Sequence, residues 1–342
     1  MRASVLRDGR MVYRDDVDEP VPGPGQVLVG VRACGICGSD LHFAKHGAEM
    51  LALGTRMSGM PSTGSPGLDL NRDVYMGHEF SAEVLVAGPG TDAPAPGTVV
   101  TSIPALLSPN RVDLIVCSNS VIGGYAERML LSAPLLLEVP NGLDPDHAAL
   151  TEPMAVGLHA VNKSAIQRGE TALVLGCGPI GIAIIAALAN RGVETVVAAD
   201  YSPKRRQLAQ TMGAHQTVDP AVSSPFDSTT PAVTFEAVGV PGIIDDVLRR
   251  APMGSRIVIA GVCMPPDTVH PFFGIAKEIS IQFVFGYDPA EFAESLRAIA
   301  DGEISVSPLI TGAVGLDGVD AAFDELADPG RHCKILVTPP SP

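Results

Sequence analysis

The chain has 342 residues, and its 23 lysines and arginines against 38 aspartates and glutamates give a formal net charge of −15. This charge disfavours electrostatic binding to nucleic acid or to an anionic membrane surface. With 46 % hydrophobic and 18 % charged residues, the composition excludes a disordered tail and suggests two globular domains. The longest uncharged apolar stretch, residues 179–190, is shorter than the about 20 residues that span a bilayer. The N-terminus lacks a secretory pattern, and we therefore expect a cytoplasmic protein with no membrane contact.

The first 145 residues or so predict a β-rich domain. Short β-rich runs such as 26–32 and 83–87 are separated by proline and glycine turns, and no alternation of strands with helices is present. Residues 44–75 are rich in glycine, methionine and serine without clear periodicity. Such a long irregular segment is typical of a functional lid or of a disordered insertion, and both alternatives stay open.

The middle of the chain alternates apolar runs with helical patterns, which predicts a doubly wound α/β domain with a parallel sheet. We expect strands at 171–175, 194–199, 215–218, 233–237, 255–260 and 279–285, with helices at 180–191, 203–213, 242–250 and 289–301. Residues 305–339 return to the β-rich style and end in a strand at 334–338. We therefore assign 1–147 and 302–342 to the β-rich domain, and 148–301 to the α/β domain.

The stretch 176–181, Gly-Cys-Gly-Pro-Ile-Gly, follows one predicted strand and opens the next helix. This is the context of a dinucleotide-binding loop, in which the glycines permit the tight turn, the approach of the pyrophosphate and close packing of helix on strand. Asp200 lies 19 residues after Gly181, at the end of the next strand, where a carboxylate accepts the hydroxyls of the adenosine ribose. We predict these cofactor-binding residues: Gly176, Gly178, Pro179, Ile180, Gly181, Asp200 and Arg205.

Asp200 also favours NAD over NADP, because its charge repels a 2′-phosphate. Lys204, Arg205 and Arg206 follow closely and weaken this preference if they face the cofactor. The alternative is that these basic residues form a solvated helix face.

Two short segments of the β-rich part concentrate metal-binding side chains. Cys37, Asp40 and His42 lie in the first, and His78 and Glu79 in the second. A further carboxylate, at residue 152, precedes a proline at the start of the α/β part. The pair of thiols at 34 and 37 fits a redox site less well, since such a pair is expected within a βαβ pattern.

At this point the sequence resembles the zinc-dependent medium-chain alcohol and polyol dehydrogenases over nearly its whole length. The segments that carry the resemblance are Cys-Gly-Ile-Cys-Gly-Ser-Asp-Leu-His at 34–42, Gly-His-Glu at 77–79, Glu-Pro-Met-Ala-Val-Gly-Leu-His at 152–159, the glycine loop, and 304–310. The resemblance implies a GroES-like β-rich catalytic domain followed by a Rossmann cofactor domain.

The resemblance also implies roles for individual residues. Cys37 and His78 correspond to zinc ligands, with Asp40 orienting His78. Glu152 stands where the alcohol dehydrogenase branch has a second cysteine, and Glu79 is either a second carboxylate behind the metal or an alternative ligand. A fourth position is then left for water or substrate.

A zinc ion at this place lowers the pKa of a bound alcohol, and hydride passes to the nicotinamide. Ser39, a cofactor ribose hydroxyl and His42 would relay the released proton to solvent. Lys334 corresponds to a basic residue that contacts the cofactor pyrophosphate, with an ordinary surface lysine as the alternative.

The sequence departs from the family where many members carry a structural zinc held by four cysteines. Residues 99–124 contain only Cys117, so we predict one catalytic zinc and no structural zinc. This lobe is expected to fold around apolar residues such as Leu106, Leu107 and Ile115, or against a partner subunit.

The predicted function is hydride transfer between NAD and a secondary alcohol, polyol or primary alcohol. The alternatives are a zinc-free quinone or enone reductase on the same fold and a non-catalytic dinucleotide-binding protein. The expected partner is a small-molecule substrate, without nucleic acid. We also expect a homodimer or homotetramer that joins through the sheet edge at 279–285.

Overall fold

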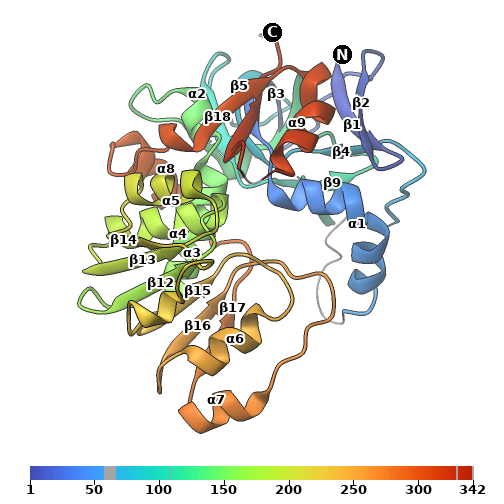
Figure 1. The fold of residues 1–342 in the computed structure, drawn as a ribbon. Helices are drawn as coiled ribbons and strands as arrows, with labels where there is room; N and C mark the ends of the chain where they lie inside the picture. Colours follow the sequence, from blue (N-terminus) through green and yellow to red (C-terminus); the bar gives the residue numbers. More distant parts are fainter. Residues whose placement is uncertain (58–66, 109, 329, 341–342) are drawn as a thin grey trace. The chain divides into compact units, whose positions relative to one another are not determined.

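Figure 1 shows the computed structural model of the protein, which describes residues 1–57, 67–108, 110–328 and 330–340. The chain forms two compact units. Unit 1 comprises Met1–Glu152, Ile299–Asp301 and Ile310–Pro342, and unit 2 comprises Pro153–Ala298 and Gly302–Leu309. Within the described ranges, none of the helices combines the length and the apolar character that a membrane span requires.

Unit 2 is built on a parallel sheet in the order β14-β13-β12-β15-β16-β17. Its first strand in the sequence, β12, lies in the middle, and later strands are added on both sides of it. This is the doubly wound arrangement, and it confirms the predicted fold class and all six predicted strands to within two residues at each end. The strands are β12 (Thr171–Leu175), β13 (Thr195–Ala199), β14 (Gln216–Val218), β15 (Val233–Glu236), β16 (Arg256–Ile259) and β17 (Ser280–Phe283).

The helices of this part are α3 (Thr151–Lys163), α4 (Pro179–Asn190), α5 (Pro203–Thr211), α6 (Ile243–Arg250), α7 (Pro271–Lys277) and α8 (Pro289–Ala300), with short 3₁₀ turns at η2 (Pro225–Asp227) and η3 (Ser307–Leu309). Helix α4 is apolar on nearly all sides because it is buried, and it packs on β12 and β13. Helix α5 begins as predicted, with Ser202 as its N-cap and Pro203 in its first turn. Helix α7 was not predicted.

Unit 1 consists of mostly antiparallel sheets. The largest has the order β11-β6-β5-β3-β19-β18, with β10 also pairing with β3, and a second sheet has the order β2-β1-β4-β9. The strands are β1 (Ala3–Arg7), β2 (Arg10–Arg14), β3 (Gln26–Gly35), β4 (Val74–Met76), β5 (Glu79–Ala87), β6 (Val99–Ser102), β7 (Ala105–Ser108), β8 (Arg111–Leu114), β9 (Cys117–Ser118), β10 (Arg128–Ser132), β11 (Leu136–Glu138), β18 (Ile310–Val314) and β19 (Lys334–Val337).

The last strand of the chain belongs to the sheet of the first residues. Strand β19 pairs antiparallel with β3, so that Leu336 lies opposite Gly35, and β3 in turn pairs with β5, where Gly35 lies opposite Glu79. The helices of unit 1 are α1 (Gly38–Gly54), α2 (Pro145–Ala148) and α9 (Val319–Leu326), with 3₁₀ turns at η1 (Ala133–Leu135) and η4 (Leu316–Gly318). The sheet register therefore brings three distant segments of sequence together at the start of β19.

The prediction of an irregular segment from residue 44 onward is wrong for its first part, because α1 continues to Gly54 with a kink at His46. Phe43, Gly47 and Met50 form a stripe at helical spacing, and Gly47 lies against the Phe43 ring and Leu70. The glycine in this stripe obscured the apolar periodicity. Residues 58–66, which the lid hypothesis also includes, lie outside the described residues.

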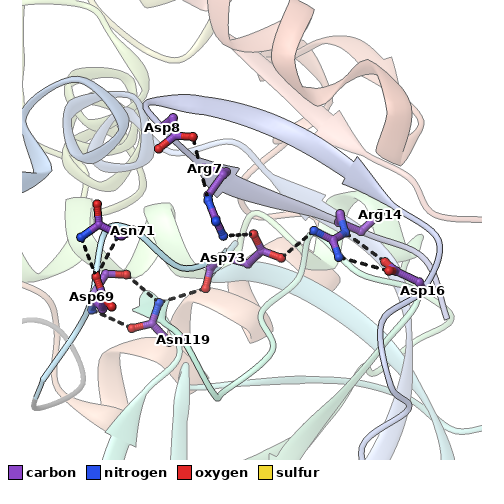
Figure 2. A network of polar contacts seen from close by, with 8 residues as sticks. All are labelled: Arg7, Asp8, Arg14, Asp16, Asp69, Asn71, Asp73 and Asn119. Carbon is purple, nitrogen blue, oxygen red and sulfur yellow. Dashed lines mark hydrogen bonds and ion pairs between the residues drawn. The ribbon is translucent and has the colours of Figure 1, made fainter.

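The chain enters β4 through a network of polar contacts, shown in Figure 2. The Asn119 side chain accepts a hydrogen bond from Asp69 N (2.8 Å) and donates to the carbonyl oxygens of Asp69 (3.0 Å) and Asp73 (2.9 Å). The Asp73 carboxylate pairs with Arg7 (2.9 Å) and Arg14 (3.1 Å) from β1 and β2. These contacts fix the backbone immediately before residues 77–79.

The lobe at residues 99–124 contains a β-hairpin of β7 and β8. Leu106 and Ile115 are buried in the core of unit 1, as predicted, and Leu107 is half-buried. Apolar packing therefore contributes to the fold of this lobe.

Candidate active site

Three potential metal ligands from two segments converge in unit 1. Cys37 is the N-cap of α1, while His78 and Glu79 lie at the junction of β4 and β5. One ligand atom from each of the three residues lies within 4.8 Å of the others. His78 and Glu79 are buried and Cys37 is half-buried, so Cys37 is the most exposed of the three.

Asp40 orients two members of this group. Its Oδ2 accepts a hydrogen bond from Cys37 N at 3.1 Å, and its Oδ1 lies 3.5 Å from Nδ1 of His78. Both Oδ1 and Nδ1 are buried and have no other partner among the described residues. With Nδ1 directed at a carboxylate, Nε2 is the nitrogen that His78 can offer to a metal.

The charges around His78 match this arrangement. Burial lowers the pKa of His78, but the nearby charges of Asp40 and Cys37 outweigh it and leave the pKa well above its ordinary value. A cation at this position is therefore stabilised by its surroundings, whether it is a proton or a metal ion.

Glu79 and Lys334 form a buried ion pair in which each side chain is 1 % exposed. Nζ of Lys334 donates to both carboxylate oxygens of Glu79, at 2.6 and 2.7 Å, and to the carbonyl oxygen of Ile36 at 3.0 Å. Gly35 leaves the space for this pair, because a Cβ there would lie 2.1 Å from Oε2 of Glu79.

The geometry of Lys334 contradicts one of its two predicted roles, that of an ordinary surface lysine. An ammonium group has three protons to donate, and all three are directed at buried oxygen atoms of unit 1. Lys334 is therefore not a surface lysine, and its charge compensates that of Glu79.

The remaining predicted residues of unit 1 lie on α3 and α1. Glu152 is half-buried in the first turn of α3 and is not a member of the converging group. Ser39 and His42 lie three residues apart in the first turns of α1, with Ser39 half-buried and His42 exposed. Partial burial and the neighbouring His46 and Lys45 lower the pKa of His42, so its imidazole is neutral and can accept a proton at neutral pH.

The predicted dinucleotide loop has the expected geometry. Gly176 has a φ of +89°, which favours glycine, and a Cβ on Gly181 would lie 1.9 Å from the carbonyl oxygen of Gly176. Gly178 is the N-cap of α4, and the nearest atom to a Cβ there would be Nη1 of Arg205 at 3.8 Å. The loop is thus closely packed on one side and open at Gly178, with Pro179 and Ile180 half-buried in the first turn of α4.

Asp200 lies beside this loop. Its Oδ2 accepts a hydrogen bond from Cys177 N and its Oδ1 accepts one from Ser202 N, each at 2.8 Å. Nη1 of Arg205 lies 4.0 Å from the carboxylate. Arg206 bonds to backbone oxygens and to Asp219 (3.0 Å). Of the three basic residues, Lys204 is exposed, while Arg205 and Arg206 are half-buried.

Comparison with known proteins assigns the family. The model of the alcohol dehydrogenase GroES-like domain matches residues 23–141, and that of the zinc-binding dehydrogenases matches residues 179–301. The chain belongs to the zinc-dependent medium-chain dehydrogenases. It is an oxidoreductase with the GroES-like and Rossmann domains that the sequence predicted.

Curated relatives and solved structures of this family match the chain over almost its whole length. (R,R)-butanediol dehydrogenase of Bacillus subtilis is 29 % identical and covers 99 % of this chain and 100 % of its own, and a crystal structure of that enzyme has a TM-score of 0.84. A zinc-binding dehydrogenase of Sinorhizobium meliloti, bound to NADP, is 29 % identical with a TM-score of 0.84 over 99 % of both chains. Sorbitol dehydrogenase of Bacillus subtilis is 24 % identical over 99 % of this chain and 97 % of its own.

The donor set fits the zinc of this dehydrogenase family. A thiol, an imidazole and a carboxylate are all ligands that zinc accepts in four-coordinate sites with an open position. Nε2 of His78, whose Nδ1 faces Asp40, and the half-buried thiol of Cys37 supply two of these donors. Glu79 and Glu152 are the two candidates for the carboxylate.

A second group of potential ligands in unit 2, His159, Asp288 and Glu291, has a structural explanation. Glu291 accepts hydrogen bonds from His159 Nδ1 (2.7 Å), Asn162 Nδ2 (2.7 Å) and Asp288 N (2.8 Å). The last of these caps the start of α8. The Glu291 carboxylate therefore links α3 to the start of α8 through these three hydrogen bonds.

One residue of the site, Tyr125, was not identified from the sequence. The buried hydroxyl of Tyr125 donates a hydrogen bond of 2.5 Å to Oδ2 of Asp40. The adjoining glycines at 123 and 124 indicate a close backbone approach, but no local pattern reveals a partner 85 residues away.

Proposed function

We propose that this protein is an NAD-dependent, zinc-dependent dehydrogenase of small alcohols or polyols. The observation that supports the proposal is the convergence of Cys37, His78 and Glu79 in unit 1, together with the dinucleotide loop and Asp200 in unit 2. The names of the relatives, butanediol and sorbitol dehydrogenases, make vicinal diols and sugar alcohols the first substrates to test.

Cys37 and His78 would hold one catalytic zinc ion, with Glu79 or Glu152 as the third protein ligand. The bound ion supplies a Lewis acid that lowers the pKa of an alcohol. The ion pair of Glu79 with Lys334 favours Glu152 as the ligand, because Glu79 would have to give up two short hydrogen bonds to reach a metal.

Ser39 and His42 would carry the proton away from the substrate. Both lie at the start of α1, next to the ligand Cys37, and His42 is exposed to solvent. Its lowered pKa leaves the imidazole free to accept the proton at neutral pH.

Unit 2 would bind the hydride acceptor at the loop 176–181. The open position at Gly178 and the N-terminus of α4 suit the pyrophosphate, and Asp200 suits the ribose hydroxyls. We propose NAD as the cofactor because the Asp200 carboxylate opposes a 2′-phosphate, although Arg205 lies close enough to reduce the preference.

A homodimer is proposed through the edge of the parallel sheet. Strand β17 ends the strand order and pairs only with β16 among the described strands, and all four of its residues are exposed. Phe283 and Phe285 are exposed by 65 % and 76 %, and Phe272 and Ile275 of α7 are exposed as well. An apolar strand edge of this kind is suited to pairing with a second copy around a two-fold axis.

The experiment is a kinetic screen of alcohols and polyols with NAD and with NADP, following NADH formation. We expect turnover of at least one diol or sugar alcohol and a decrease of kcat of about 10²-fold or more in His42→Gln, with loss of a proton-transfer partner. The matched control is His46→Gln, four residues along α1. Full activity after zinc removal, or bound cofactor without turnover of any alcohol, would contradict the proposal.

A further inference from the structure

The buried hydroxyl of Tyr125 bonds to Asp40, the residue that faces the candidate metal ligand His78. The proposed proton and hydride transfers do not involve Tyr125. We propose that Tyr125 is a positioning residue for the metal ligand His78 and acts through Asp40. This inference rests on the proposed zinc site. Tyr125 is not one of the proposed ligands, and its hydroxyl would act without contacting the metal.

The backbone of Tyr125 first fixes the segment that carries His78. Tyr125 N donates to the carbonyl oxygen of Met76 at 3.2 Å, and Gly124 N donates to the carbonyl oxygen of Gly77 at 2.8 Å. Gly77 has a φ of +97°, and a Cβ there would lie 2.8 Å from the ring of Tyr125. The tyrosine ring therefore packs directly against the residue that precedes His78.

The hydroxyl of Tyr125 then fixes the orientation of Asp40. Oδ2 of Asp40 accepts hydrogen bonds from the phenol at 2.5 Å and from Cys37 N at 3.1 Å. Burial and the Asp40 charge raise the pKa of Tyr125 well above its ordinary value, so the phenol keeps its proton and remains a donor. Two donors on Oδ2 prevent the carboxylate from rotating.

The other carboxylate oxygen of Asp40, Oδ1, transmits this effect to His78. With Oδ2 occupied, Oδ1 is left to face Nδ1 of His78 at 3.5 Å, and no other partner is available to either atom among the described residues. This fixes the ring orientation and the nitrogen that carries the proton. When a metal replaces a proton on His78, the remaining proton is held on Nδ1 and Nε2 is the nitrogen that binds the metal.

The alternative is that the hydroxyl only satisfies a buried carboxylate and stabilises the fold. The ring itself packs edge-on against Phe323, with centroids 6.3 Å apart, and phenylalanine would fill nearly the same volume. Tyr125→Phe therefore removes the hydroxyl with little change in packing. A purely structural role would lower the stability of the metal-free protein without changing its affinity for zinc.

The test is zinc affinity, measured on the full-length protein by competition with a chromogenic chelator. We expect Tyr125→Phe to bind zinc about tenfold more weakly, at the lower end of the about 10–100-fold range for residues that orient metal ligands, since it acts through one intermediate residue. Tyr75→Phe, in the neighbouring strand β4, is the matched control and should bind zinc like the wild type. The visible absorption of the cobalt-substituted protein should also change in Tyr125→Phe and not in Tyr75→Phe.

A double-mutant cycle with Asp40→Asn tests whether Tyr125 acts on His78 through Asp40. If Tyr125 acts through Asp40, Tyr125→Phe should weaken zinc binding less than twofold in the Asp40→Asn background. Equal affinity in Tyr125→Phe and wild type, or independent effects of the two substitutions, would overturn the inference. A wild-type protein that binds no zinc would instead contradict the proposed function.

Discussion

At the scale of single residues, the site depends on charges that are compensated inside the protein. Glu79 is buried beside the candidate ligands, and Lys334 neutralises it from a strand more than 250 residues later in the chain. The pair is isolated from water, so its two charges depend on each other much more than surface charges do.

Lys334→Met should destabilise the metal-free protein by about 3–5 kcal/mol, because it leaves the Glu79 carboxylate buried without a counter-charge. The measurement is the free energy of unfolding from a urea titration. The double variant Lys334→Met/Glu79→Gln is the control and should recover a large part of the loss, since no uncompensated charge remains. A single variant as stable as the wild type would show that Glu79 does not carry its charge in the fold.

Asp200→Asn tests the choice of cofactor. The amide accepts only one of the two backbone hydrogen bonds, those from Cys177 N and Ser202 N, because only its oxygen is an acceptor, and it no longer repels a 2′-phosphate. We expect the ratio of kcat/KM for NAD to that for NADP to fall by about fivefold or more, since two charges about 4 Å apart repel each other by about 1 kcal/mol or more. Lys204→Ala, on the exposed side of α5, should leave the ratio unchanged. An unchanged ratio in Asp200→Asn would assign cofactor selection to other residues.

At the scale of elements, Glu291 links the start of α8 to α3. Burial raises the pKa of Glu291, but the hydrogen bonds from Asn162, Asp288 N and His159 outweigh it and lower the pKa below its ordinary value of 4.5. A lowered pKa in the folded state means that this stabilisation is present above about pH 4.5 and is lost as the pH falls through the folded-state pKa.

Glu291→Gln should therefore reduce the free energy of unfolding by about 1.5–3 kcal/mol at pH 7, the range for hydrogen bonds to charged groups. The difference from the wild type should shrink below pH 4.5 as the wild-type carboxyl becomes protonated. Urea titrations at pH 7 and pH 4 measure both effects. Glu294→Gln, exposed on the same helix, is the control, and a difference that does not depend on pH would contradict the assignment.

The sequence predicted the elements of unit 2 well because their patterns follow directly from burial. Strands such as β12 and β13 are buried on both faces, and α4 is apolar throughout. Helix α7 was missed because its aromatic residues, such as Phe272, are exposed and give no core-facing stripe. Helix α1 was missed because Gly47 interrupts its apolar stripe.

The candidate site was predictable only in part, for a different physical reason. The segments of Cys37 and His78 could be found because each is a short motif, and the resemblance to a family paired them. The ion pair of Lys334 with Glu79 could not be predicted, because it depends on the pairing of β19 with β3 and of β3 with β5. The contact between Tyr125 and Asp40 likewise arises from the fold and has no local signature.

At the scale of the whole molecule, the exposed apolar edge of unit 2 predicts self-association. Phe283→Asp places a charge in β17 and should convert the proposed dimer to a monomer, since a buried unpaired charge opposes association. Light scattering coupled to size exclusion measures the mass. Val222→Asp, an exposed apolar residue elsewhere in unit 2, is the control. A wild-type protein that stays monomeric at micromolar concentration would contradict the proposed interface.

If Cys37 and His78 hold a single catalytic zinc ion, the zinc content per chain must depend on both side chains. Wild type, Cys37→Ser and Cys263→Ser would be purified in parallel and analysed by mass spectrometry of the metal. We predict about one zinc per chain in the wild type and in Cys263→Ser, whose thiol lies in unit 2, and a loss of nearly all zinc in Cys37→Ser. Zinc at wild-type levels in Cys37→Ser would contradict the account.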